Sequence, residues 1–156
     1  MIKLYKTIDS QLHYHEAWMD GSKITEHWGV VGERGKTAQH KRDKKLSEED
    51  ALLAVLESPL ADGFAPFDED EEVILLIEYA VDGFGTSKDL DKRHALEERM
   101  NETLGWTGLG HCDGGSIGSG TMEVCCVVVD FEIAKRVIQK DLARTKFRDY
   151  TKIVAE

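Results

Sequence analysis

The stretch ESPLADGFAPFDEDEE, residues 57–72, divides the chain into two parts. It contains both prolines of the sequence, Pro59 and Pro66. Proline fixes its own φ and disfavours helix at the residue before it, so we expect neither helix nor sheet interior here. Phe64 and Phe67 are apolar exceptions in this polar stretch, and we expect them to hold the connection against one of its neighbours.

The sequence therefore predicts two domains, over residues 1–58 and 72–156, joined by an acidic, proline-containing linker over 59–71. A chain of 156 residues is long enough for two small domains or one large one. Hydrophobic residues make up 41% and charged residues 32%, which is a globular profile and argues against wholesale disorder.

Residues 1–58 are predicted to form a small antiparallel β-sheet followed by one helix. Asp20-Gly21 is a favoured two-residue hairpin turn, because both residue types tolerate positive φ. Ser47 is expected to begin the helix by accepting a hydrogen bond from the amide of Asp50. The predicted strands cover residues 2–5, 12–19, 22–31 and 36–42.

Residues 72–156 are predicted to fold in the order β-α-β-β-α-β, which is the ferredoxin-like split β-α-β arrangement. The apolar run over residues 73–81 is expected to be a central strand buried on both faces. Asp89 or Asp91 is expected to cap the first helix and Asp130 the second. The sequence as a whole therefore predicts an α+β chain.

The stretch HWGVVGERG, residues 27–35, resembles the core of the WGR domain family. The resemblance covers about residues 1–60 and includes the order of strands, turn and helix around the motif. It implies an association with nucleic acid, because the family occurs in nucleic-acid enzymes such as poly(ADP-ribose) polymerases, where the Trp and Arg of the motif contact DNA ends. The family also occurs in bacterial proteins of unassigned role. The matching residues are Trp28, Gly29, Val31, Gly32 and Gly35.

Val30 stands where the family has its arginine. Valine cannot pair with a phosphate as a guanidinium does, so this DNA contact does not carry over. Arg34 and Lys36 could supply positive charge from the neighbouring turn. The alternative is that Trp28 is a packing residue and that the glycines only shape a tight turn.

The net charge of −10 is unevenly distributed. Residues 61–72 hold six acidic residues and no basic one, whereas residues 34–45 hold six basic residues against Asp43. A basic stretch can contact phosphates, although a solvated strand end and loop is the simpler interpretation. The candidate binding residues are Trp28, Arg34, Lys36, Lys41, Arg42, Lys44 and Lys45.

The glycine-rich segment over residues 108–120 is the other candidate site. It lacks the Gly-Lys-Ser/Thr ending of a phosphate loop and runs into a predicted strand over 122–130, so we interpret it as a hairpin connection. Cys112 beside His111 leaves a small hydrolase or transferase as the alternative function, because a nearby His can lower the pKa of a thiol. Adjacent residues on a strand point in opposite directions, which argues against it.

Four histidines lie on neighbouring predicted strands, namely His13, His15, His27 and His40. Such an arrangement could bind zinc at a sheet face, but no cysteine falls in this half of the chain. We interpret them as surface histidines and expect neither a metal nor a cofactor.

The sequence predicts a non-enzymatic binding or adaptor protein whose partner is another protein, or a nucleic acid bound weakly through residues 34–45. No apolar run approaches the roughly 18 residues of a membrane span, and the first residues lack the apolar core of a signal peptide. The three cysteines, Cys112, Cys125 and Cys126, show no paired spacing. We expect a cytoplasmic location, no disulfide framework, and small apolar roles for the last two cysteines.

Overall fold

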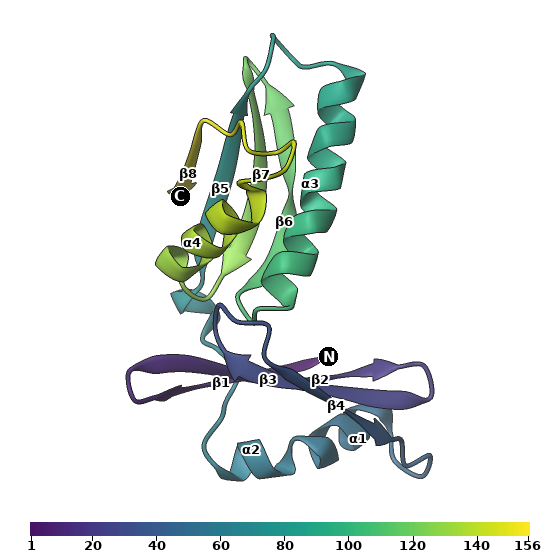
Figure 1. Cartoon of the computed structure of the whole chain (residues 1–156). Helices are drawn as coiled ribbons and strands as arrows, with labels where there is room; N and C mark the ends of the chain where they lie inside the picture. Colours follow the sequence, from purple (N-terminus) through teal and green to yellow (C-terminus); the bar gives the residue numbers. More distant parts are fainter. The chain divides into compact units, whose positions relative to one another are not determined.

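Two four-stranded antiparallel sheets organise the chain, one in each of two units, Met1–Glu69 and Asp70–Glu156. The computed structural model describes all 156 residues (Figure 1). Each unit combines its sheet with two α-helices. The chain is therefore α+β, as its sequence predicted.

The strands of the first unit follow one another as a meander, in the order β1-β2-β3-β4. Asp9 and Ser10 form the first hairpin turn, and both have the positive φ that a two-residue hairpin favours. The second turn consists of Gly21 and Ser22, because Asp20 still pairs across the sheet, so the expected Asp20-Gly21 turn is wrong by one residue. The strands are β1 (Ile2–Ile8), β2 (Gln11–Asp20), β3 (Lys23–Val30) and β4 (Lys36–Lys41).

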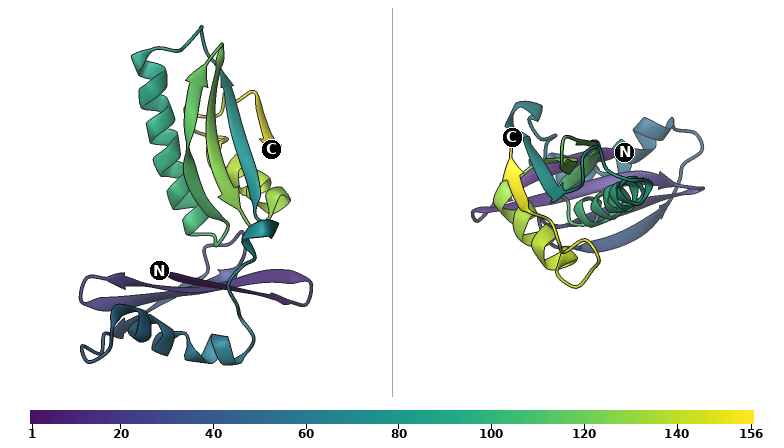
Figure 2. Two further views of the ribbon diagram at one scale, coloured as in Figure 1. Left: turned by 180° about the vertical axis from the view of Figure 1, so that it is seen from behind. Right: turned by 90° about the horizontal axis from the view of Figure 1, so that it is seen from above.

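Two helices, α1 (Glu48–Val55) and α2 (Glu57–Ala61), lie on one side of this sheet (Figures 1 and 2). The hydroxyl of Ser47 accepts a hydrogen bond of 3.1 Å from the amide of Asp50, which confirms the expected cap. The apolar side chains between α1 and the sheet form the core of this unit. They are Leu4, Ala17, Ile24, Ala51, Leu52 and Leu56.

The proline-containing segment is more ordered than expected. Its first residues form α2, so the expectation that no helix occurs there is wrong. Pro59 is the third residue of this helix, a position whose amide has no partner within a helix in any case. Phe64 packs against the core of the first unit, and the Phe67 ring lies edge-on to that of Tyr5 at 5.4 Å. The two phenylalanines thus hold the connection to the first unit.

The second unit has the element order β-α-β-β-α-β and the strand order β6-β7-β5-β8, with every neighbouring pair antiparallel. This is the expected ferredoxin-like arrangement. A short 3-10 turn, Glu69–Glu71, precedes it. Its elements are β5 (Val73–Ala80), α3 (Ser87–Gly105), β6 (Gly110–Gly118), β7 (Thr121–Val128), α4 (Phe131–Leu142) and β8 (Lys152–Ala155).

Strand β5 buries only one of its faces. Leu75, Ile77 and Tyr79 are buried, whereas Ile74 is 40% exposed and Leu76 is half-buried. The expectation that this strand is buried on both faces is therefore wrong. A strand in a sheet with one covered face normally alternates apolar and polar residues. Apolar residues on the open face of β5 replace this alternation with a continuous apolar run.

Each helix of the second unit begins at a side-chain cap. Thr86 caps α3, with a hydrogen bond of 3.3 Å from the Asp89 amide, and the Asp89 carboxylate accepts one of 2.8 Å from the Thr86 amide. The expectation that Asp89 or Asp91 is the cap is therefore wrong, because the capping box starts the helix one turn earlier. Asp130 caps α4 as expected, accepting from the Ile133 amide at 2.8 Å.

The glycine-rich segment is itself a strand, so its interpretation as a connection is wrong. Most of it forms β6, which pairs along β7 with a bulge between Cys112 and Gly115. A Cβ atom at Gly115 would lie 2.3 Å from the carbonyl oxygen of Glu123, so the missing side chain allows close approach. The glycines therefore build the bulged edge strand rather than link two strands.

Candidate functional site

A positively charged hollow of about 510 Å³ lies beside the end of β4. Its walls come from the β2–β3 hairpin, from β4 and from the loop that follows β4. Four of its residues carry a positive charge and none carries a negative one, so we call it the basic hollow. It is lined by Ser22, Lys23, Gln39, His40, Lys41, Arg42 and Lys44.

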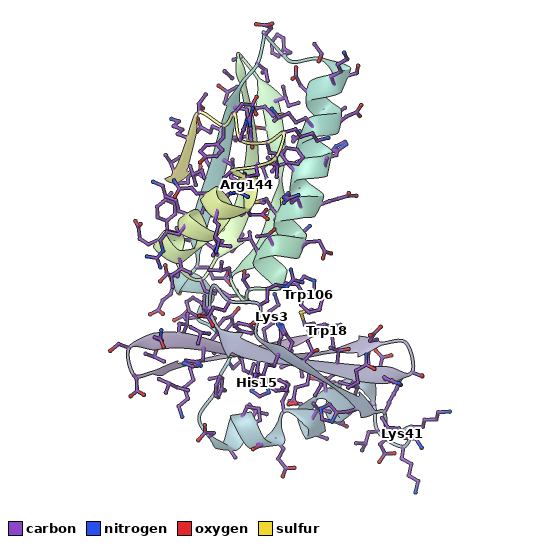
Figure 3. All side chains as sticks on the ribbon, viewed as in Figure 1. Lys3, His15, Trp18, Lys41, Trp106 and Arg144 are labelled. Atoms are coloured by element: carbon purple, nitrogen blue, oxygen red, sulfur yellow. The ribbon has the colours of Figure 1, made fainter.

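Two lysines face each other in the basic hollow. Lys23 of β3 and Lys41 of β4 are direct cross-strand partners, and Figure 3 shows Lys41 at the end of its strand. The Cβ atoms of such partners lie about 4.5–5.5 Å apart, and like charges at this spacing destabilise a sheet. The register therefore concentrates positive charge at one point, which a bound anion would neutralise.

Arg42 supplies a further donor to the basic hollow. Its Nη1 atom lies 3.5 Å from the Glu48 carboxylate at the start of α1. Its Nε atom is buried and has no hydrogen-bond partner. A buried donor without an acceptor is costly, so the Arg42 side chain is left with an unsatisfied N–H at the wall of the hollow.

Two further acidic residues close to the basic hollow in sequence, Asp43 and Asp20, make other contacts. The Asp43 carboxylate accepts a hydrogen bond of 2.9 Å from the amide of Lys45. The Asp20 carboxylate accepts one of 3.3 Å from the hydroxyl of Thr25. Neither carboxylate lines the basic hollow, which leaves its positive charge uncompensated apart from the contact of Arg42.

The structure brings together only some of the predicted binding residues. Lys41, Arg42 and Lys44 line the basic hollow, whereas Lys45 is exposed in the loop beside it. Arg34 and Lys36 lie at the other end of β4, roughly 16 Å away along a six-residue strand.

Lys23 lines the same hollow and was missed in the sequence. The feature of the sequence that could have identified Lys23 is its position directly after the β2–β3 turn, where it lies opposite Lys41. This identification requires the register between β3 and β4, which the sequence alone does not give.

A second hollow, of about 610 Å³, lies between the sheet and the two helices of the first unit. Trp28 lies on one of its walls, and its ring stacks on that of His15 with centroids 5.6 Å apart. Trp28 is half-buried, so it packs on the sheet while part of the indole stays accessible. We call this the aromatic groove. It is lined by His15, Glu26, Trp28, Val55, Ser58, Pro59, Ala61, Asp62 and Phe64.

Glu26 connects the aromatic groove to the basic hollow. One carboxylate oxygen lies 3.1 Å from Nε2 of His15, and the other lies 3.2 Å from Nε2 of His40. His15 lines the groove and His40 lines the hollow. Trp28 and Lys23 are five residues apart on β3, or roughly 16 Å. Five is an odd number of steps, so the two side chains leave opposite faces of β3, and a chain-like ligand would contact both by passing around the edge strand β4.

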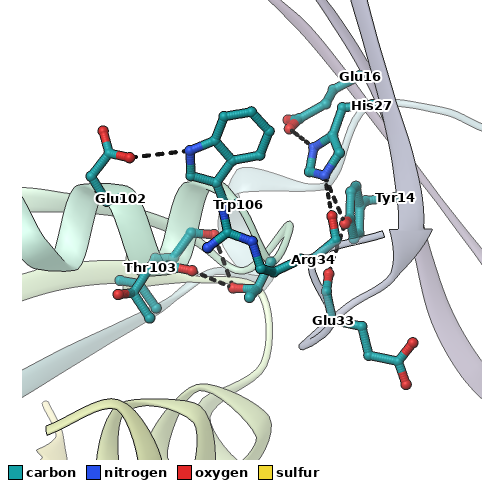
Figure 4. A network of polar contacts seen from close by, with 10 residues as sticks. Tyr14, Glu16, His27, Glu33, Arg34, Glu102, Thr103 and Trp106 are labelled. Atoms are coloured by element: carbon teal, nitrogen blue, oxygen red, sulfur yellow. Dashed lines mark hydrogen bonds and ion pairs between the residues drawn. The ribbon is translucent and has the colours of Figure 1, made fainter. Parts of the chain in front are cut away.

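A third histidine lies on the opposite face of the sheet. His27 is buried, with Nδ1 2.8 Å from the Glu16 carboxylate and Nε2 3.1 Å from the Tyr14 hydroxyl (Figure 4). The Tyr14 hydroxyl donates a hydrogen bond of 2.7 Å to the carbonyl oxygen of Glu33. This network anchors the β3–β4 turn to the sheet, so it positions the motif rather than a ligand.

The four histidines of the first unit do not all lie on one face, and the interpretation of them as surface histidines is wrong for His27, which is fully buried. Figure 3 shows His15 on the helix side of the sheet and Trp18 on the opposite side, the side that also carries His27. No group of three or more His, Cys, Asp or Glu side chains that could hold a metal ion occurs in the structure. No helix is long and apolar enough to cross a bilayer.

The glycine-rich strand separates the residues of the alternative enzyme site. His111 is exposed and Cys112 is half-buried, and as neighbours on β6 they point to opposite faces. Cys126 is buried in the core face of β7, as expected, whereas Cys125 is half-buried on its other face.

Compared with protein-family models, with curated proteins and with solved structures, the chain matches none.

Proposed function

We propose that this chain is a non-enzymatic binding protein whose first unit binds single-stranded nucleic acid, with phosphates in the basic hollow. The observation that carries the proposal is the pairing of Lys23 with Lys41 beside the unsatisfied Nε of Arg42. Phosphate oxygens would relieve the repulsion between the two lysines and accept a hydrogen bond from the guanidinium.

The aromatic groove supports a single strand over a duplex. Proteins that bind single strands combine a basic channel for the backbone with aromatic rings on which bases stack. Trp28 offers a partly accessible indole in this groove, on which a base could stack. A strand with one base stacked on Trp28 would reach Lys41 and Arg42 by passing around the edge strand β4.

The overall charge sets the strength of this binding. A net charge of −10 repels a polyanion, so the local attraction works against the field of the whole chain. Binding is therefore weak and steeply dependent on salt. The resemblance of residues 27–35 to the WGR family supports a nucleic-acid partner, with the cations of the basic hollow in place of the arginine that Val30 replaces. We place this activity in the cytoplasm.

Fluorescence anisotropy with a labelled twelve-residue oligothymidylate tests the proposal. The variant Lys41→Gln/Arg42→Gln/Lys44→Gln should bind about tenfold more weakly or worse in low salt. The slope of log affinity against log salt should fall by about 2 in magnitude, since each phosphate contact to a single strand contributes about 0.7. The matched control is Arg136→Gln/Lys140→Gln/Arg144→Gln, which removes three cations in and just after α4 and gives the same net charge.

The control should bind like the unmodified chain. If both variants lost the same affinity, the loss would come from the change in net charge, and the basic hollow would not be the binding site. Tight binding of polyglutamate with the same loss in the first variant would point instead to an acidic protein partner.

Trp28 tests the stacking part of the proposal separately. Trp28→Phe keeps an aromatic face and should retain most of the affinity, whereas Trp28→Leu should lose about 1–3 kcal/mol of binding free energy. Equal affinities for the two variants would remove the aromatic groove from the site.

A further inference from the structure

We propose that Cys112 and Cys126 are a modification site that forms a reversible disulfide across β6 and β7. The two cysteines are direct cross-strand partners in the second unit. This inference is independent of nucleic-acid binding by the first unit.

The hydrogen-bond pattern of the ladder places this pair in the closer of the two antiparallel geometries. The Val129 amide donates to the carbonyl oxygen of Leu109 at 2.9 Å, so those two residues are a hydrogen-bonded pair. Along an antiparallel ladder, hydrogen-bonded and non-hydrogen-bonded residue pairs alternate. Cys112 and Cys126 are the third pair after Leu109 and Val129, so they are a non-hydrogen-bonded pair. The Cys112 amide accordingly donates to the Asn101 side chain, at 2.8 Å.

This geometry suits a disulfide. The Cα atoms of a non-bonded pair lie about 4.5 Å apart, at the lower end of the roughly 4.4–6.8 Å that disulfides span. The bulge begins directly after Cys112, and Gly114 within it has a φ of 100°. Since the ladder is interrupted there, β6 has room to adjust as the S–S bond forms.

The two thiols have different environments. Cys126 is fully buried, whereas Cys112 is half-buried, so an oxidant reaches Cys112 first. A hydrogen bond between the thiols lowers the pKa of Cys112 and raises that of Cys126. Cys112 is thus the attacking thiol and Cys126 the resolving one.

A small disulfide such as oxidised glutathione supplies the oxidising equivalents. The Cys112 thiolate attacks one of its sulfurs, and the S–S bond of glutathione breaks to release one glutathione thiolate. Cys126 gives up its proton and attacks the Cys112 sulfur, which releases the second glutathione. In sum, the two protein thiols lose two electrons and two protons, and the small disulfide becomes two thiols.

The experiment incubates the full chain with oxidised glutathione, blocks free thiols with N-ethylmaleimide and measures intact mass and cross-linked peptides. We expect a species that has lost two hydrogens, takes up one maleimide at Cys125 and regains both thiols with dithiothreitol. Cys125→Ala is the matched control, because its side chain points to the other face of β7, and it should form the same bond.

The other variants should stop the reaction at defined points. Cys112→Ala should form no internal disulfide, and Cys126→Ala should accumulate a mixed disulfide between Cys112 and glutathione. Full labelling of all three cysteines in the unmodified chain, or a cross-linked peptide containing Cys125, would overturn the proposal. The peptide assignment in the unmodified chain decides the outcome even if Cys126→Ala fails to fold.

Discussion

Gly35 packs so closely on Trp28 that a Cβ atom at Gly35 would lie 2.1 Å from the Trp28 carbonyl oxygen. The φ of Gly35 is also positive, at 66°. The turn between β3 and β4 therefore needs glycine at position 35 for two separate reasons, its backbone conformation and its close contact with β3.

We predict that Gly35→Ala destabilises the first unit far more than Gly21→Ala. Gly21 has nearly the same φ, 63°, but nothing lies within 4 Å of a Cβ atom there, so it isolates the cost of the conformation, about 1–2 kcal/mol. Gly35→Ala adds a clash with backbone that cannot move without breaking the β3–β4 turn. Urea unfolding measures both changes in unfolding free energy. Equal losses of stability would show that the contact between Gly35 and Trp28 adjusts to a Cβ atom without cost.

The lysine pair of the basic hollow predicts a gain in stability from losing a charge. Lys41→Gln should raise the unfolding free energy by about 0.2–1 kcal/mol in low salt, because it removes the repulsion with Lys23. Lys36→Gln is the control, since Lys36 lies on the same strand opposite the uncharged Trp28. Thermal unfolding in low and high salt checks this, and a loss of stability in Lys41→Gln would contradict the repulsion.

Two buried tyrosines predict that stability falls at alkaline pH. Burial raises the pKa of Tyr14, with a further rise from nearby Glu16, and burial likewise raises the pKa of Tyr79. In the unfolded chain both hydroxyls ionise near pH 10. Above about that pH the unfolded state releases protons that the folded state retains, so the unfolding free energy decreases as pH rises.

Urea unfolding at about pH 9 and pH 11 measures this decrease. The double variant Tyr14→Phe/Tyr79→Phe should show a smaller decrease, because neither side chain can ionise. The same pH dependence in the variant would assign the loss of stability to other groups.

Limited digestion at glutamate residues tests the connection between the units. Glu69, Glu71 and Glu72 are exposed in or beside the short 3-10 turn, whereas Glu57 is exposed but begins α2. After α2, Ala65 pairs with β1 through backbone hydrogen bonds, which protects the chain up to that point. First cuts should therefore fall at Glu69–Glu71 or just after it, and a first cut at Glu57 would contradict the docking of the segment.

Local chemistry explains which parts of the fold were predictable. The caps at Ser47 and Asp130 depend on one side chain and an amide three residues later, so the sequence contains all the information. The order of elements follows equally from periodicity and turn residues. The error at β5 has a different origin, because whether a sheet has one or two covered faces depends on where both helices pack.

The candidate site shows the same division. The cations of residues 34–45 are visible in the sequence, but their separation into two ends of β4 follows from the strand being extended. The contribution of Lys23 depends on register, which is a tertiary property. Prolines in the connecting segment suggested an irregular chain, yet Pro59 occupies the one part of a helix that tolerates it.

A map of amide and indole chemical-shift changes in the isotope-labelled full chain, titrated with oligothymidylate, tests the central claim most directly. We predict fast-exchange shifts that concentrate at Lys23, at residues 39–44 and at the Trp28 indole, and that diminish as salt is added. Shifts confined to the second unit, or no shifts at all in low salt, would contradict the assignment of the basic hollow as a nucleic-acid site.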